Sequence, residues 1–162
     1  MAQVDYFLKI DGIKGESQDD KHKDEIAIES WSWGETNTGS FSHGGGGGTG
    51  KVQMEDFRFV KRMDKASPGL FLSCASGKHI PKAELVCREA GEQPAEYLKI
   101  TLSDVLISSY QAKGPGADVI RPTEEFSLNF AKIEFEYSEQ KADGSVVPAG
   151  KTGWDLKAHK KL

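Results

Sequence analysis

The sequence has few cysteines, no long hydrophobic run and no strong excess of charge of either sign. Two cysteines among 162 residues, Cys74 and Cys87, are too few for the disulfide framework of a small secreted scaffold. No apolar run approaches the roughly 20 residues that a membrane-spanning helix needs, so no stable membrane insertion is expected. The 25 acidic and 21 basic residues are mixed along the chain and leave no basic face for nucleic acid.

The first residues also lack the features of a secretory signal peptide. The segment MAQVDYFLKIDG has no basic start, no apolar stretch and no small-residue cleavage site. We therefore expect a protein made in the cytoplasm, whose export, if any, uses a route without a signal peptide. A chain of this length buries roughly 70% of its unfolded surface. It contains no linker, so residues 1–162 are predicted to form a single domain.

What the sequence contains instead is a repeated alternation of apolar and polar residues, which is typical of half-buried β-strands. The first example is VDYFLKI at residues 4–10. Further strands are predicted at 26–34, 51–61, 82–89, 97–109 and 123–137, with a short last strand near Trp154 and Leu156. The pattern predicts a mainly β protein.

One short helix is predicted beside these strands. Ser67 is expected to cap it, Pro68 suits its first position, and Gly77 is expected to end it. Its predicted apolar face consists of Leu70, Phe71 and Cys74. One helix with six or more strands predicts a β-barrel or sandwich with the helix packed on its flank.

The apolar residues change face part-way along two predicted strands. Val52 and Met54 share one face, whereas Phe57 and Phe59 fall on the other. In the segment 123–137 the set Phe126, Leu128 and Phe130 is followed by the set Ile133, Phe135 and Tyr137. One extra residue in each strand, a β-bulge, would return both sets to one side and bend the strand, as a closing barrel needs. A strand buried on both faces is the alternative.

A glycine-rich segment at residues 42–50, SHGGGGGTG, imitates a nucleotide-binding loop. Gly45, Gly50 and Lys51 have the phosphate-loop spacing. However, Val52 stands where a Ser or Thr would bind magnesium, and a strand pattern follows in place of a helix. We therefore predict no nucleotide cofactor. Glycine loses more backbone entropy on ordering than other residues, so this surface loop is useful if it orders only against a partner.

No other cluster supports catalysis or metal binding. Cys74, His79 and Cys87 lack the close cysteine spacing and the fourth ligand of a zinc site, and both cysteines are expected to be buried apolar groups. The charged run at 19–25 lacks the central glycine of a calcium loop and is predicted to be a solvated connection. The carboxylates at 124–125 are strand neighbours that face opposite ways. The prediction is a protein with no metal, no cofactor and no catalytic residue.

Two tryptophans and two serines alternate along the second predicted strand. Trp31 and Trp33 share one face and are expected to lie in the core, because tryptophan is a common buried anchor. Ser30 and Ser32 then lie on an accessible surface of small, uncharged groups, which tolerates varied contacts.

Five segments in this order resemble the haemolysin-coregulated protein (Hcp) family of bacterial type VI secretion systems. They are YFLKIDGIKGES at 6–17, His22 with EIAIESWSWG at 25–34, GGGGGTGK at 44–51, DKASPGLFLSCASGKHI at 64–80 and SLNFAKIEFEY at 127–137. The resemblance covers nearly the whole chain. It implies a small bulged β-barrel with one short helix packed on its flank.

The resemblance further implies a structural tube subunit and not an enzyme. In this family six copies form a ring with a wide pore, and the rings stack into the inner tube of a contractile injector. A sheath surrounds the tube, a spike trimer caps it, a baseplate belongs to the same machine, and small effector proteins can travel in the lumen. The protein is then expected to be secreted to the extracellular space or a target cell.

Two site assignments follow from the resemblance. Ser30 and Ser32 are candidates to face the lumen. The glycine-rich loop is the candidate contact between stacked rings, and its residues are Ser42, His43, Gly44, Gly45, Gly46, Gly47, Gly48, Thr49 and Gly50.

Two other classes remain open from the residues alone. A monomeric β-barrel binding module, such as an oligonucleotide-binding fold, is disfavoured by the acidic balance and by the lack of a basic aromatic groove. An enzyme is disfavoured by the incomplete motifs above. Mass in solution separates both from a six-fold ring.

Overall fold

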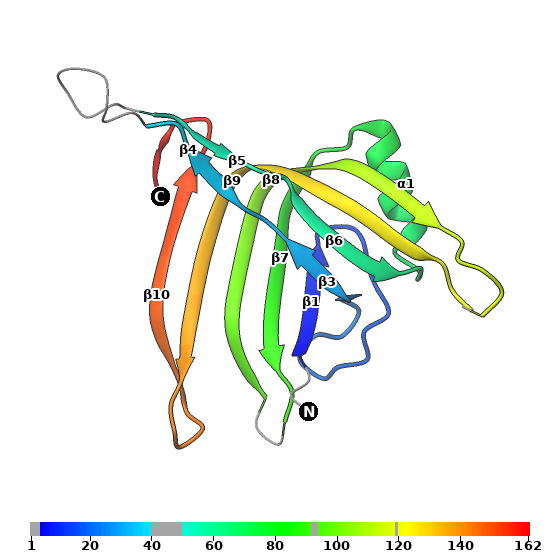
Figure 1. The fold of residues 1–162 in the computed structure, drawn as a ribbon, viewed down its shortest axis with the longest axis horizontal. Coiled ribbons are helices and arrows are strands. Elements are labelled where there is room, and N and C mark those ends of the chain that lie inside the picture. The colour runs from blue at the N-terminus through cyan, green and yellow to red at the C-terminus, as the bar shows by residue number, and fades with distance from the viewer. Residues whose placement is uncertain (1–3, 40–49, 92–93, 119) are drawn as a thin grey trace.

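β-strands make up most of the computed structural model, which describes residues 4–39, 50–91, 94–118 and 120–162 (Figure 1). The strands are β1 (Val4–Ile10), β2 (Ile26–Ile28), β3 (Ser30–Ser32), β4 (Glu35–Asn37), β5 (Val52–Met54), β6 (Phe57–Arg62), β7 (Ile80–Glu89), β8 (Ala95–Lys113), β9 (Thr123–Gln140), β10 (Val146–Asp155) and β11 (Lys160–Lys161). The helix α1 (Ser67–Ser76) lies between β6 and β7 in the chain. The mainly β class with one short helix is confirmed.

The strand pairings follow one another around the core. β8 pairs with β7, β7 with β1, and β1 with β2. After Glu29 the chain continues as β3, which pairs with β6, and β6 pairs with β9, which returns to β8. Glu29, between β2 and β3, donates its N–H to the carbonyl oxygen of Val60 at 2.8 Å and so joins this connection to β6. The result is a curved sheet wrapped around the core, in which no ladder between β2 and β6 closes the predicted barrel among the described residues, and β10 and β11 extend the sheet beyond β9.

The change of face in β9 occurs as expected. The cross-strand pairs Leu102–Ile133 and Val105–Phe130 both lie in the core, although their members are three residues apart on each strand. The register stays continuous from the pair Leu102–Ile133 to the pair Ile107–Leu128, so the predicted bulge in β9 is wrong, and the change of face falls at the same place on both strands. Asp104 of β8, which lies between the two pairs, has a positive φ of 55°. A bulge does occur in β8, between Ile107 and Ser109.

The bulge that the sequence predicts between Met54 and Phe57 is not present. The segment 51–61 is not one bulged strand, because β5 and β6 belong to different sheets with residues 55–56 between them. Phe57 and Phe59 are nevertheless fully buried, and Met54 packs against the same core. The predicted strand 26–34 is likewise divided into β2 and β3.

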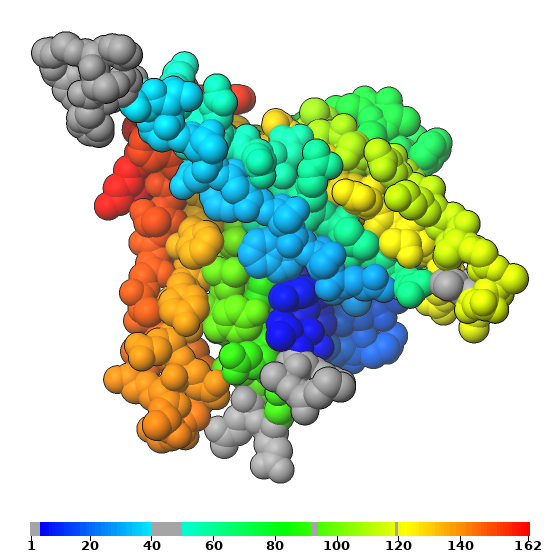
Figure 2. Space-filling model, in the orientation of Figure 1, coloured from blue at the N-terminus to red at the C-terminus, as the bar shows by residue number. Residues whose placement is uncertain are grey.

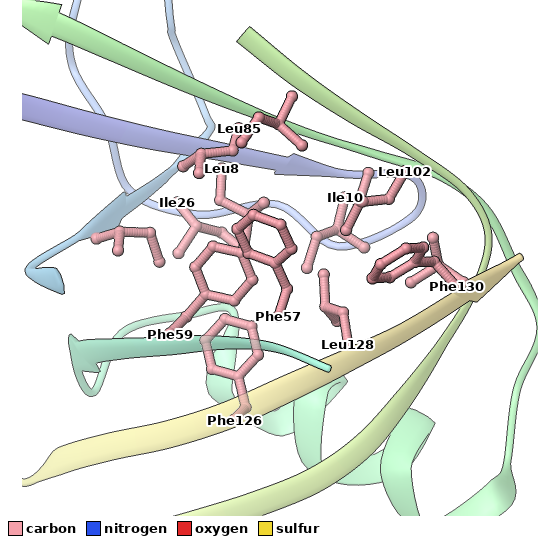
Figure 3. Close-up of a cluster of buried hydrophobic side chains, with 14 of the residues drawn as sticks. Leu8, Ile10, Ile26, Phe57, Phe59, Leu85, Leu102, Phe126, Leu128 and Phe130 are labelled. Carbon is pink, nitrogen blue, oxygen red and sulfur yellow. The ribbon is translucent and has the colours of Figure 1, made fainter. Parts of the chain in front are cut away.

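Stacked phenylalanines form the centre of the core (Figure 3). The ring of Phe59 lies 5.5 Å from that of Phe57 and 5.3 Å from that of Phe126, so β6 and β9 are joined by aromatic contacts as well as by backbone hydrogen bonds. All three side chains are fully buried. Leu8 and Ile26 of β1 and β2 close the opposite side of this cluster (Figure 3).

The helix α1 differs from its prediction at the start and on its outer face. Ser67 is the first helical residue and not the cap: its hydroxyl oxygen accepts the N–H of Asp64 at 3.0 Å. Gly77, at φ 64°, ends the helix as predicted. Leu70 is buried, but Phe71 is 59% exposed and therefore does not belong to the core.

β10 is the main element that the sequence pattern missed. Only its end, near Trp154, was expected to be extended. Most of its side chains are exposed, so the alternation that marks half-buried strands is absent. Pro148 and Gly150 flank a bulge, which interrupts the pattern further.

Candidate assembly surfaces

Trp31 and Trp33 fix the orientation of β3. Each indole ring stacks on the ring of Phe57, at 5.7 Å for Trp31 and 5.6 Å for Trp33. Both tryptophans are half-buried and pack against the core, as expected. Because side chains alternate along a strand, this packing turns the hydroxyls of Ser30 and Ser32 outward, and both serines are exposed.

Ser30 and Ser32 belong to a wider polar surface that crosses four strands. Ser32 pairs with Arg58, and Arg58 pairs with Ser127 of β9. In the parallel row Ser30 pairs with Val60, and Val60 with Glu125. We call this surface the polar face. Its polar residues with exposed surface are Ser30, Ser32, Asp56, Arg58, Ser108, Glu125 and Asn129, and the half-buried Val60 and the buried Ser127 lie between them. In Figure 2 β3 crosses the visible face of the molecule.

Hydrogen bonds tie the polar face together. Asp56 accepts the hydroxyl of Ser108 at 2.7 Å and the side-chain amide of Asn129 at 2.9 Å. Arg58 and Glu125 form an exposed ion pair at 3.9 Å. The sequence pattern did not reveal that these residues lie on the same face as Ser30 and Ser32. Alternation shows which way a side chain points, and it does not show which strands are neighbours.

The glycine-rich loop lies outside the described residues, except for Gly50. Its stem is described: Glu35 pairs with Met54 and Asn37 with Val52, in a two-stranded arm that projects from the body (Figure 1). Asn37 donates its side-chain amide to the carbonyl oxygen of Gly50 at 3.3 Å. A Cβ atom at Gly50 would lie 2.3 Å from the backbone nitrogen of Gly39, so the close approach requires glycine here. A strand, β5, follows Lys51 at the place where a phosphate-binding loop would open a helix.

A buried ionic cluster anchors the start of α1 to β6 and β9. The ammonium of Lys61 lies 2.6 Å from Glu124 and 2.8 Å from Asp64. Burial alone raises the pKa of Glu124, but the hydrogen bonds from Lys61, Ser67 and Tyr110 hold that pKa below its usual value. Glu124 therefore remains ionised at neutral pH. Its burial, opposite to the exposed Glu125, confirms that the two neighbours point different ways.

A second cluster shows that the charged run at 19–25 is not simply solvated. His22 is 7% exposed, stacks on Phe7 at 4.3 Å and lies between the carboxylates of Glu25 and Glu96, at 2.9 and 2.6 Å. Arg88 bonds both oxygens of Asp19 at 2.7 and 3.0 Å. The prediction of a solvated connection is wrong at these positions, because Arg88 of β7 bonds Asp19 and Glu96 of β8 bonds the buried His22.

Within the described ranges no group of three or more His, Cys, Asp or Glu residues is placed to hold a metal ion. His79 bonds Asp104 at 2.9 Å, Cys87 is buried, and Cys74 is half-buried. No helix in the described part of the chain is long and apolar enough to cross a membrane.

Comparison with known proteins decides the family. The family model described as "Type VI secretion system effector, Hcp" matches residues 7–137. Protein hcp1 of Pseudomonas aeruginosa is 51% identical over 156 residues, which cover 95% of this chain and 96% of that protein. The chain belongs to the Hcp family. This result confirms the resemblance of its sequence to the Hcp family.

Solved structures of Hcp proteins have the same fold. Hcp1 from Salmonella typhimurium is 41% identical, with a TM-score of 0.79 and full coverage of both chains. A second solved type six secretion system protein, 31% identical, reaches a TM-score of 0.93 over 99% of this chain and 100% of that one. Membership of the Hcp family confirms the interpretation as a type VI secretion tube protein over a monomeric binding module.

Proposed function

We propose that this chain is the repeating subunit of the inner tube of a type VI secretion system, and that it acts as a structural protein without catalysis. The observation that carries the proposal is the family match over residues 7–137. In this proposal residues 1–162 work as a single domain, and six copies close a head-to-tail ring. Rings stack into a tube that a contractile sheath surrounds and that meets the spike trimer and the baseplate.

The polar face is proposed to line the lumen, with Ser30 and Ser32 among its exposed members. Its exposed side chains are mostly small or polar, and Arg58 is paired with Glu125. A wall of this kind has no large apolar patch to hold a passing protein tightly. Small effector proteins can therefore bind and still be released.

The glycine-rich loop, Ser42–Gly50, is proposed to contact the neighbouring ring. Six of its nine residues are glycine, so it brings little side-chain surface of its own for a core. Its stem, β4 with β5, projects from the body (Figure 1), which supports a role in reaching another copy.

The protein is proposed to be made in the cytoplasm and exported by the contractile machine without a signal peptide. The mass in solution tests the assembly first: it should be about six times the subunit mass of 17.7 kDa. Electron microscopy should show rings and tubes, and the protein should appear in culture medium only when the sheath is intact. A monomer at micromolar concentration, or secretion without the sheath, would contradict the proposal.

A further inference from the structure

The connection between β1 and β2 covers part of the sheet face that points away from the core. We call residues 11–25 of this connection the strap, and in Figure 1 it is the blue segment that follows β1. Side chains alternate along a strand, so Phe7 points away from the core that its neighbour Leu8 enters. Phe7 is nevertheless only 6% exposed, because His22 of the strap stacks on its ring with the two centroids 4.3 Å apart.

Each ring nitrogen of His22 lies against a different carboxylate. Nδ1 is 2.9 Å from an oxygen of Glu25 within the strap, and Nε2 is 2.6 Å from an oxygen of Glu96 on β8. An ionised carboxylate only accepts hydrogen bonds, and a neutral imidazole carries a single N–H. Both hydrogen bonds therefore need one proton more than a neutral ring and two carboxylates hold.

The charges around the ring favour this additional proton. They are those of Asp19 and Glu25 in the strap, Asp5 on β1, Arg88 on β7, and Glu96 and Lys99 on β8. Arg88 and Lys99 are both bonded to other carboxylates. Among the described residues Glu25 and Glu96 have no ion-pair partner except His22, so a proton on this ring offsets their negative charge.

Loss of this proton breaks the contact that runs from the strap to the sheet. The side chain of Glu25 is 14% exposed and is held beside the ring, whereas that of Glu96 is 43% exposed and can turn towards water. A neutral His22 therefore keeps its one N–H for Glu25. Its other nitrogen then presents a lone pair to the carboxylate of Glu96, and the repulsion between them separates the strap from β8.

We propose that the proton on His22 is a latch, and that residues 20–25 of the strap lift from β8 and uncover Phe7 when a rise in pH removes it. The opening stops at Asp19, because its bond to Arg88 does not depend on this proton. The inference goes beyond the proposed tube function and does not depend on it. It assigns a conformational switch to the strap.

The direction of the switch follows from proton binding. The closed strap holds one proton more than the open strap, so closure is favoured as the pH falls and opening as the pH rises. The other contact of the strap with the sheet does not titrate in the range from pH 6 to pH 9. The hydrogen bond from Arg88 lowers the pKa of Asp19 to about 2, and the same contact raises the pKa of Arg88, so both groups stay charged.

Hydrogen exchange of the protein in its native assembly, followed by mass spectrometry, tests the latch. The backbone N–H groups of His22, Asp24 and Glu25 are bonded to carbonyl oxygens within the strap, so they report its opening. After correction for the intrinsic exchange rate, their protection should fall between pH 6 and pH 9. The steepest fall should be about tenfold per pH unit, which is the dependence on one proton. Peptides from β7 are the internal reference and should show no such slope.

Two substitutions remove the need for the proton and keep the shape of the site. In Glu96→Gln the introduced amide donates a hydrogen bond to the ring nitrogen that faces it, so a neutral His22 has both partners. Glu25→Gln has the same effect at the other nitrogen. In each variant the slope should disappear, and the strap should stay protected at pH 9. Glu139→Gln, which removes an exposed carboxylate on β9, is the matched control and should keep the slope.

Three results would overturn the proposal. They are protection of the strap that does not change with pH in the unmodified protein, protection that increases as the pH rises, and a slope that remains in Glu25→Gln or Glu96→Gln. A slope that is lost in both of these variants and kept in Glu139→Gln supports the latch. A monomeric mass would refute the tube function and leave this measurement unaffected, so the two failures are distinguishable.

Discussion

Lys61 and Glu124 form an ion pair with no exposed surface, and the Lys61 ammonium lies 2.6 Å from a carboxylate oxygen of Glu124. Lys61 comes from β6 and Glu124 from β9, and the same ammonium reaches Asp64 just before α1. Two charges are thus removed from water where the helix joins the sheet. Their mutual neutralisation makes the position of α1 depend on a side-chain network as well as on apolar packing.

Removal of one charge from this pair should be more harmful than removal of both. Lys61→Met leaves Glu124 buried without its partner, so we expect a loss of about 3 kcal/mol or more in the free energy of unfolding. Lys61→Met combined with Glu124→Gln should recover part of that loss. Urea denaturation measures both variants. Equal stability of the single and double variants would show that the pair does not act as a unit.

The contact between Asp19 and Arg88 should give stability that is lost in acid. The hydrogen bond from Arg88 lowers the pKa of Asp19 from 3.8 to about 2. A folded-state pKa below the unfolded value means that the carboxylate stabilises the fold above about pH 4, and that this contribution disappears as the pH falls towards 2. Because Asp19 is partly solvated, Asp19→Asn should cost about 1 kcal/mol at neutral pH.

Thermal unfolding of Asp19→Asn between pH 7 and pH 2 checks this sign. The difference in melting temperature between Asp19→Asn and the unmodified protein should become smaller below pH 4. Asp20→Asn is the neighbouring control, and its difference should remain small throughout. A difference that grows in acid would contradict the assignment.

An arginine side chain introduced on the polar face should change the binding of effector proteins and leave the assembly of the tube unchanged. Ser32 is exposed on β3, so Ser32→Arg adds volume without disturbing the stacking of Trp31 and Trp33 on Phe57. We expect hexamers and tubes to persist, with the amount of co-purified effector protein changed several-fold. Ser145→Arg, at the turn between β9 and β10, is the matched control. Loss of the hexamer in Ser32→Arg would move this surface to a subunit interface.

Shortening of the glycine-rich loop should impair stacking of rings alone. Replacement of residues 44–48 by a short Gly-Ser link removes chain that supplies no core side chains, so the melting temperature and the hexamer should be nearly unchanged. Ordering costs roughly 1 kcal/mol or more per residue, and under the proposed function contacts with an adjacent ring would offset that cost. Tube formation and secretion should fall sharply. Persistence of both would show the loop to be a tolerated insertion, and unfolding would place it in the core.

Much of the fold follows from local sequence pattern. The alternation in 4–10 and 82–89 gave strands close to β1 and β7, because half-buried strands repeat every two residues. The change of face in 123–137 is present in β9, but the register with β8 is continuous from Leu102 to Ile107, so the extra residue that the pattern predicted in this strand is not the cause. The exposed β10 was missed because a solvated strand carries no apolar signal, and the division of 51–61 into β5 and β6 was missed because periodicity does not identify the partner strand.

By itself the sequence determined the mainly β class, the position of the helix and the outward direction of Ser30 and Ser32, since each depends on neighbours along the chain. Only the tertiary structure decided which segments meet. It brought Arg58 and Ser127 beside the serines, enclosed Lys61 with Glu124, buried His22 between two carboxylates, and left Phe71 and Leu72 outside the core. These outcomes depend on strand order and register, which link residues tens of positions apart, and no local periodicity contains that information.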